Sequence, residues 1–171
     1  MTADGKTRPN AVGLLYRHVL DERARRLFAP GGRVMVLPRM LDEAGPFDGA
    51  FAGPGALDDA DLETLGRAVA AALRPGAPVL ICIPRGRPGT ARLGPREARA
   101  RLGPGFAWSA SFGLGVLVPG EAREAWARRH PQGVGMLAAL ESVVRRWPIV
   151  RAHGEYVALE GSRSARPPDT L

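Results

Sequence analysis

The sequence has one cysteine, Cys82, and one lysine, Lys6, among its 171 residues. A single cysteine excludes an internal disulfide and leaves no zinc motif to assemble. Aromatic residues make up only 6% of the chain, which leaves little material for the stacking platforms that bind single-stranded nucleic acid. These absences argue against disulfide-stabilised, zinc-finger and single-strand-binding classes.

Long hydrophobic runs are also missing. The longest, such as Val79–Ile83 and Val116–Val118, are far shorter than the roughly 20 residues that cross a bilayer. Residues Met1–Asn10 are polar and lack the apolar core of a secretory signal. We therefore expect a cytoplasmic protein without a membrane span.

The chain is long enough, and with 45% hydrophobic residues apolar enough, for one domain with a substantial core. Its net charge of +7 comes almost wholly from arginine. A basic surface attracts nucleic acid or anionic substrates. However, the codon usage of a GC-rich genome gives the same excess of arginine, so nucleic-acid binding is the lesser of the two interpretations.

A strand, a helix and a second strand follow one another between Phe47 and Ile83. The first strand is the short apolar run Phe47–Ala52, and an acidic helix start at residues 58–61 precedes apolar residues at helical spacing from Leu62 to Leu73. Val79–Ile83 is a continuous apolar run, which is typical of a strand covered on both faces. This order predicts a parallel pair joined by a right-handed crossover, with the helix on one face of the sheet.

The rest of the chain supplies further elements around this unit. We predict a single domain of residues 11–161, between a disordered N-terminus (1–10) and a disordered tail (162–171). Its other predicted helices are Ala11–Phe28, Pro95–Leu102, Glu121–Arg129 and Gly133–Trp147, and its other predicted strands are Arg33–Leu37, Phe106–Val118 (one strand or two) and Glu155–Glu160.

The order of these motifs resembles class I S-adenosylmethionine-dependent methyltransferases. The run Phe47-Asp48-Gly49-Ala50-Phe51-Ala52 and the later Leu73-Arg74-Pro75-Gly76 before a buried strand are similar to that family's fourth and fifth strands. Gly115–Pro119, Trp126–Pro131 and Gly154–Val157 are similar to its closing segments, so the resemblance covers about Phe28 to Gly161. It implies a truncated Rossmann-like α/β sheet of about five strands, with a parallel centre, antiparallel C-terminal strands and helices on both faces.

The sequence departs from the family after the first predicted strand. There the family carries a Gly-x-Gly loop that lets the backbone approach the cofactor, whereas Gly32–Leu37 runs directly into Pro38-Arg39-Met40. Only about nine residues separate Leu37 from Phe47, and a parallel crossover needs roughly a dozen or more. The first strand is therefore expected to pair antiparallel or to lie at an unprotected edge. Asp42 and Glu43 lie too close to that strand to serve as the family's ribose-binding acid.

Two loops are candidate binding sites. Gly53-Pro54-Gly55-Ala56 follows a parallel strand at its carboxyl end, where open α/β sheets bind ligands, and the resemblance makes it the candidate cofactor-binding loop. The alternative is a tight turn that needs glycine for its backbone angles alone. Pro84-Arg85-Gly86-Arg87 ends the next strand and could bind an anion, but a solvated loop is the favoured interpretation.

Other reactive residues give no catalytic pattern. His18, His130 and His153 lack metal-ligand spacing, and Ser109 and Ser111 lack the Gly-x-Ser-x-Gly context of a hydrolase. Cys82 falls within the buried strand, where it behaves as a small hydrophobic residue.

Three functions remain open at this point. The resemblance implies a methyltransferase that uses S-adenosylmethionine on a small-molecule substrate, chiefly by positioning, so that no catalytic side chain is identified. The second is a non-catalytic paralogue that serves as a binding or oligomerising module, with a homo- or hetero-oligomeric partner covering an exposed sheet edge. The third and weakest is an anion or nucleic-acid binder that uses the arginines of Arg85–Arg101.

Overall fold

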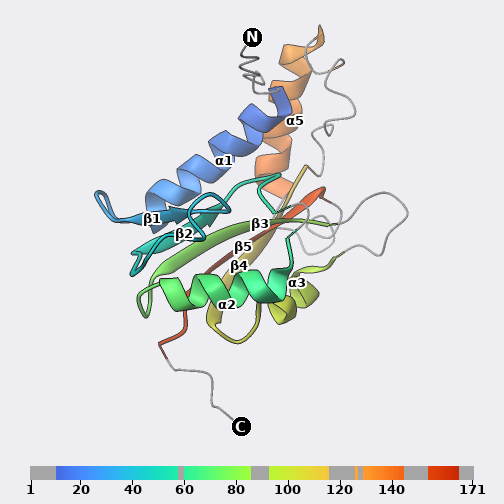
Figure 1. The fold of residues 1–171 in the computed structure, drawn as a ribbon. Coiled ribbons are helices and arrows are strands. Elements are labelled where there is room, and N and C mark those ends of the chain that lie inside the picture. The colour runs from blue at the N-terminus through green and yellow to red at the C-terminus, as the bar shows by residue number, and fades with distance from the viewer. Residues whose placement is uncertain are drawn as a thin grey trace, which may run out of the picture.

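The computed structural model describes residues 11–57, 60–85, 93–115, 126, 129–144 and 154–165. Within them, five strands form one open sheet in the order β1-β2-β3-β5-β4 (Figure 1). The strands are β1 (Val34–Val36), β2 (Gly49–Ala52), β3 (Pro78–Pro84), β4 (Phe106–Leu114) and β5 (Tyr156–Arg163). The first three pair in parallel, and β5 pairs antiparallel with both β3 and β4. The prediction of an α/β sheet of about five strands, with a parallel centre and antiparallel C-terminal pairing, is confirmed.

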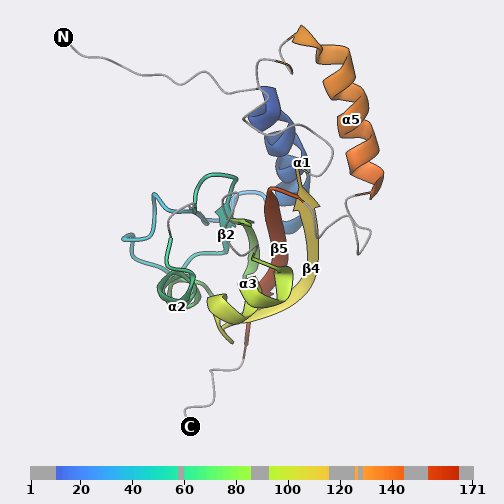
Figure 2. The same ribbon diagram turned by 90° about the vertical axis from the view of Figure 1, so that its right-hand side faces the viewer.

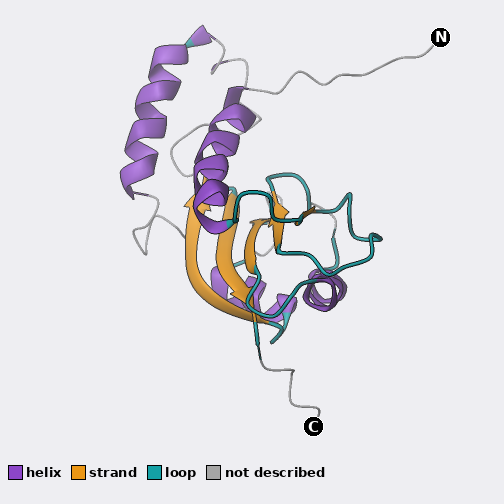
Figure 3. Cartoon of the chain, turned by 90° about the vertical axis from the view of Figure 1, so that its left-hand side faces the viewer, coloured by secondary structure: helices purple, strands orange, loops and turns teal. Residues whose placement is uncertain are grey.

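Helices cover both faces of this sheet, as predicted. The described helices are α1 (Ala11–Leu27), α2 (Leu62–Ala72), α3 (Pro95–Leu102) and α5 (Pro131–Val144). Successive side chains of β3 point to opposite faces. Val79, Ile81 and Ile83 belong to a core with α2 and α3, whereas Leu80 and Cys82 belong to a core with α1 and α5. Figures 2 and 3 show the strands between the two helical layers.

The predicted strand-helix-strand unit is present as β2, α2 and β3. Asp61 caps the helix, because its carboxylate accepts a hydrogen bond from the Glu63 backbone N–H at 3.1 Å. Hydrogen bonds from the Thr64 side chain and the Glu63 backbone N–H lower the pKa of Asp61. Leu65 and Val69 then place one face of α2 in the core.

Of the two alternatives for the first strand, antiparallel pairing is wrong and the edge position is confirmed. β1 lies at the edge of the sheet, but it pairs with β2 in parallel, with Val34 opposite Gly49. Both strands are shorter than the apolar runs that predicted them, so twelve residues, 37–48, connect them. That length meets the minimum for a parallel crossover.

The C-terminal strands also differ from their predicted bounds. β4 is one strand that ends at Leu114, with an irregularity between Trp108 and Ala110. β5 runs past Glu160 to Arg163, whose backbone N–H donates to the Ala77 carbonyl at 2.8 Å. This hydrogen bond keeps the start of the predicted tail within the sheet. Residues 1–10 and 166–171, and most of the predicted helix Glu121–Arg129, lie outside the described residues.

Candidate functional site

The carboxyl ends of the three parallel strands meet at one edge of the sheet. Leu37 follows β1, Gly53 follows β2, and Arg85 follows β3. The strand register places Val36 beside Phe51 and Ala52 beside Ile81, so β1 and β2 end side by side and β3 continues three residues further, to Pro84. In open α/β sheets this is the edge at which ligands bind.

The loop Gly53–Ala56 is a compact turn at this edge. Gly55 has a φ of +76°, a backbone conformation that side chains strongly disfavour, so its glycine is needed for the turn itself. The Ala56 N–H donates to the Gly53 carbonyl at 3.2 Å, and Ala56 packs partly against the core. Turn geometry therefore accounts for the glycine at position 55. That a cofactor binds this loop remains a prediction for all four of its residues, Gly53, Pro54, Gly55 and Ala56.

Arg85 is buried rather than solvated. Only 6% of its surface is exposed, and it is the one charged residue in the described core. Its backbone is fixed on both sides, because its N–H donates to the Glu155 carbonyl at 3.0 Å and its carbonyl accepts from Leu93 N–H at 2.8 Å. The interpretation of this loop as solvated is wrong for Arg85, while Gly86 and Arg87 lie outside the described residues.

Two further polar residues that the sequence did not indicate lie near the end of β3. Tyr16 of α1 is buried, and its hydroxyl is 3.4 Å from the Glu155 carboxylate oxygen Oε2. Gly115 lies against the same hydroxyl, because a Cβ there would be 2.1 Å from it. Tyr16 reads in the sequence as one apolar position of an amphipathic helix. Only its contact with a residue 139 positions away shows its polar role.

The connection between β1 and β2 folds back over the carboxyl end of β1. In the connection 37–48, the Leu37 N–H donates to the Phe51 carbonyl at 2.9 Å. Met40 folds back on β1, where its N–H donates to the Val36 carbonyl at 3.1 Å and its Sδ lies 3.3 Å from the Val36 N. The side chains of Met40 and Leu41 pack against the core. The connection thus covers both the outer edge of β1 and part of the core.

Acidic residues of the same connection are paired with arginines. Glu43 Oε2 lies 3.4 Å from Arg33 Nη2. The Asp48 carboxylate accepts one hydrogen bond from the Arg33 backbone N–H at 2.9 Å and another from Arg74 Nη1 at 2.5 Å. The Arg33 guanidinium also lies over the Phe47 ring, 4.3 Å from its centre. These contacts give the acids a structural role in holding the connection.

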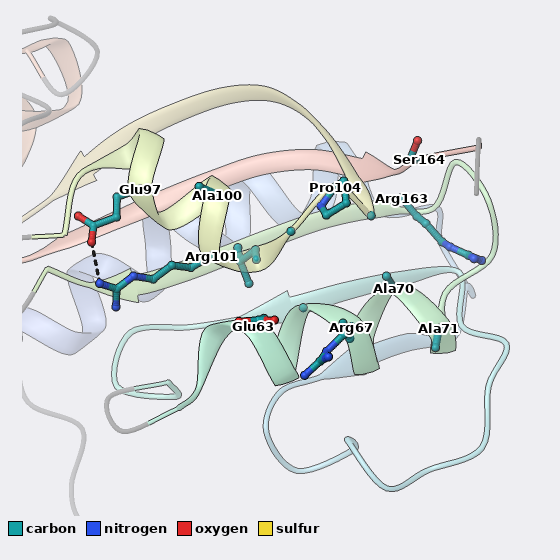
Figure 4. Close-up of a pocket in the computed structure, with 14 residues that line it drawn as sticks. Glu63, Arg67, Ala70, Ala71, Glu97, Ala100, Arg101, Pro104, Arg163 and Ser164 are labelled. Atoms are coloured by element: carbon teal, nitrogen blue, oxygen red, sulfur yellow. Dashed lines mark hydrogen bonds and ion pairs between the residues drawn. The ribbon is translucent and has the colours of Figure 1, made fainter. Parts of the chain in front are cut away.

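A cavity of about 740 Å³ lies elsewhere, between α2 and α3 (Figure 4). Its walls include Gly66, Ala70 and Ala100, and charged residues of both helices surround it. Nothing in the sequence patterns indicated this groove, because its two walls come from helices that lie far apart along the chain.

The remaining candidates have structural roles or lie outside the description. Cys82 is fully buried, and burial raises the pKa of its thiol. The Ser109 hydroxyl donates to the Glu160 carbonyl at 3.1 Å. Among the described residues, no three His, Cys, Asp or Glu side chains gather to hold a metal, and no helix is long and apolar enough to cross a membrane. The side chains of His18 and His153 fall outside the description.

No protein-family model matches this chain, and a search of curated proteins finds no match either. The functional assignment therefore depends on the residues of the chain itself.

Proposed function

We propose that the chain is a small-molecule-type methyltransferase-like protein whose activity is degenerate, and that it serves as a binding module. The observation that supports this proposal is the connection 37–48, which folds back on the end of β1, where the resemblance would put the cofactor loop. The parallel β1-β2-β3 centre and the antiparallel β5 agree with the sheet that the resemblance implies.

The backbone of this connection has few donors to offer a cofactor. A glycine loop binds by directing its amides at the ligand. Here the N–H groups of Leu37, Met40, Leu41 and Glu43 all donate to carbonyls of the chain, at 2.9 to 3.2 Å. Breaking such bonds in order to bind a ligand would cost about 0.5–1.5 kcal/mol each. The residues at the end of β1 therefore do not fit the cofactor in the family's manner.

Two of the three acids of the connection, Glu43 and Asp48, are engaged as well, whereas Asp42 is exposed and has no ion pair among the described residues. The family grips the ribose hydroxyls of the cofactor with a carboxylate. Glu43 instead faces Arg33, and Asp48 links Arg33 to Arg74. Releasing Asp48 would remove the contacts that hold the start of β2 against β1.

Titration calorimetry and thermal unfolding with S-adenosylmethionine and S-adenosylhomocysteine test the proposal. We expect no saturable heat and no stabilisation at millimolar ligand. A ligand at 100 times its Kd stabilises a protein by about 2.7 kcal/mol, and each kcal/mol raises the Tm of a chain of this size by roughly 2–4 °C. A saturable rise in Tm would therefore refute the proposal that the methyltransferase activity is degenerate.

An active enzyme is the second candidate, and the buried Arg85 favours it. A buried guanidinium directly after the carboxyl end of β3 is suited to an anionic group of a cofactor or substrate. If cofactor binding is observed, Arg85→Met should weaken it. Arg96→Gln, on the exposed surface of α3, removes the same charge as a control.

An oligomerising role is supported by an exposed apolar face on α5 and not by the edge of the sheet. Strand addition at β1 is hindered because Met40 engages both outward backbone groups of Val36. By contrast Met136, Leu140 and Val143 are 71%, 51% and 63% exposed and recur at the spacing of one helical face. If two copies associate through this face, sedimentation will detect a dimer that Leu140→Glu dissociates. A monomer at all concentrations contradicts this role.

A further inference from the structure

The groove between α2 and α3 exists because small residues line the place where the two helices meet. Gly66 brings α2 against the end of α3, since a Cβ at Gly66 would lie 2.1 Å from the Leu102 carbonyl oxygen. Gly105 similarly approaches Ala70. Next to this contact, Ala71 and Ala100 have side chains too short to fill the space between the helices. About 740 Å³ stays open, which is within the range of small-molecule sites.

The groove is separate from the carboxyl edge of the sheet. Its lining includes Gly105, which precedes β4, and Arg163, at the end of the antiparallel β5. The register pairs Pro78, the first residue of β3, with Ser162. The groove therefore lies near the amino end of β3, and a ligand there would be independent of one bound near Arg85 at its carboxyl end.

The charges around the groove favour an anion. Three arginines (Arg67, Arg101 and Arg163) and two glutamates (Glu63 and Glu97) line it. Arg101 and Glu97 pair within α3 at 2.6 Å, as the dashed line in Figure 4 marks. Arg67 has no ion pair within 4 Å among the described residues, although its charge contributes to the lowered pKa of Asp61, and its hydrogen bond to Thr64 Oγ1 is long, at 3.5 Å. The net charge of +7 adds a general attraction for anions.

We propose that this groove binds a small amphipathic anion, with an apolar body against the alanine and glycine walls and a carboxylate or sulfonate at Arg67. An apolar body matches walls of short aliphatic side chains, and the paired donors of a guanidinium match the two oxygens of such an acid. This inference goes beyond the proposed function, because it does not depend on whether S-adenosylmethionine binds.

The probe for the test is 8-anilinonaphthalene-1-sulfonate, an amphipathic anion whose fluorescence increases when it leaves water. We expect saturable binding at one site, displaced by decanoate and not by decyltrimethylammonium. Arg67→Gln should weaken binding roughly tenfold, because it removes a charge-assisted hydrogen bond. Arg26→Gln makes the same charge change on α1, on the other face of the sheet, and should leave binding unchanged.

Two further variants test the apolar walls. Ala100→Trp and Ala71→Leu lengthen exposed side chains that line the groove, so each should reduce binding without disturbing the core. Near-ultraviolet circular dichroism of each variant confirms that its fold is intact. Unchanged binding in both folded variants would overturn the site. Equal displacement by decyltrimethylammonium, or an unaffected Arg67→Gln variant, would overturn its preference for anions.

Discussion

Gly66 and Gly135 form a matched pair for testing how α2 packs against α3. Both are glycines inside helices, and replacing glycine by alanine in a helix interior gains about 1 kcal/mol from helix propensity. Their surroundings differ. A Cβ at Gly135 would meet nothing within 4 Å, whereas a Cβ at Gly66 would meet the Leu102 oxygen, carbonyl carbon and Cα at 2.1, 2.8 and 2.9 Å.

The contact at Gly66 determines the sign of the effect. Its obstacle is backbone, which cannot rotate away as a side chain can. Ordinary contact with a Cβ begins at 3.4 Å, so α3 would have to retreat by more than 1 Å from its 2.1 Å approach. Overpacking of this kind costs typically 1–3 kcal/mol. After the gain in helix propensity, Gly66→Ala should lower the free energy of unfolding by up to about 2 kcal/mol, whereas Gly135→Ala should raise it by about 0.5–1 kcal/mol.

Urea denaturation followed by far-ultraviolet circular dichroism measures both changes. The denaturation midpoint should fall for Gly66→Ala and rise for Gly135→Ala, with similar slopes if both unfold in one cooperative step. If Gly66→Ala stabilises the protein as much as Gly135→Ala does, the two helices do not meet at Gly66. The walls of the proposed groove would then also be wrong.

Three further predictions concern the core and the start of α2. Phe47 is fully buried, so Phe47→Ala should lower the free energy of unfolding by about 3–5 kcal/mol in urea, and a loss below about 1 kcal/mol would contradict its burial. The Cys82 thiol, whose pKa burial raises, should react with a thiol reagent only after unfolding, and immediate reaction in the native protein would show that β3 is accessible. Asp61→Ala should destabilise the protein at neutral pH. The folded protein lowers the pKa of Asp61, so the loss of stability in Asp61→Ala should be full above pH 3.8, the ordinary pKa of an aspartate. The difference between the two proteins should disappear as the pH falls through the lower pKa of the folded state. If their free energies of unfolding differ by the same amount at low pH, Asp61 does not cap α2 in its charged form.

Apolar runs in the sequence located the central strands but misplaced their ends. Leu37 and Phe47 are both buried and belong to the predicted strands, but both lie outside the observed strands β1 and β2. A run of apolar residues reports burial, whereas a strand is defined by hydrogen bonds to a partner. Extending both strands by these residues made the connection look too short for parallel pairing, so antiparallel pairing was one of the two alternatives that the sequence left for β1.

The candidate sites were harder to predict from the sequence than the strands, because they depend on contacts between residues far apart in the chain. The loop Gly53–Ala56 could be located because strand and helix signals flank it directly. Arg85 could not be recognised as buried, because the residue that holds its backbone, Glu155, lies seventy positions further along the chain. A glycine inside the α2 pattern could signal close packing, but the sequence does not say against which element.

The strand-helix-strand unit and the absence of a glycine loop after β1 could be recognised from the sequence alone, because periodicity, helix caps and loop composition are local properties. The tertiary structure decided the parallel pairing of β1, the filling of its end by Met40 and Leu41, the burial of Arg85 and the groove between α2 and α3. Each of these depends on which residues meet across long separations, and such contacts are set by the packing of the whole sheet.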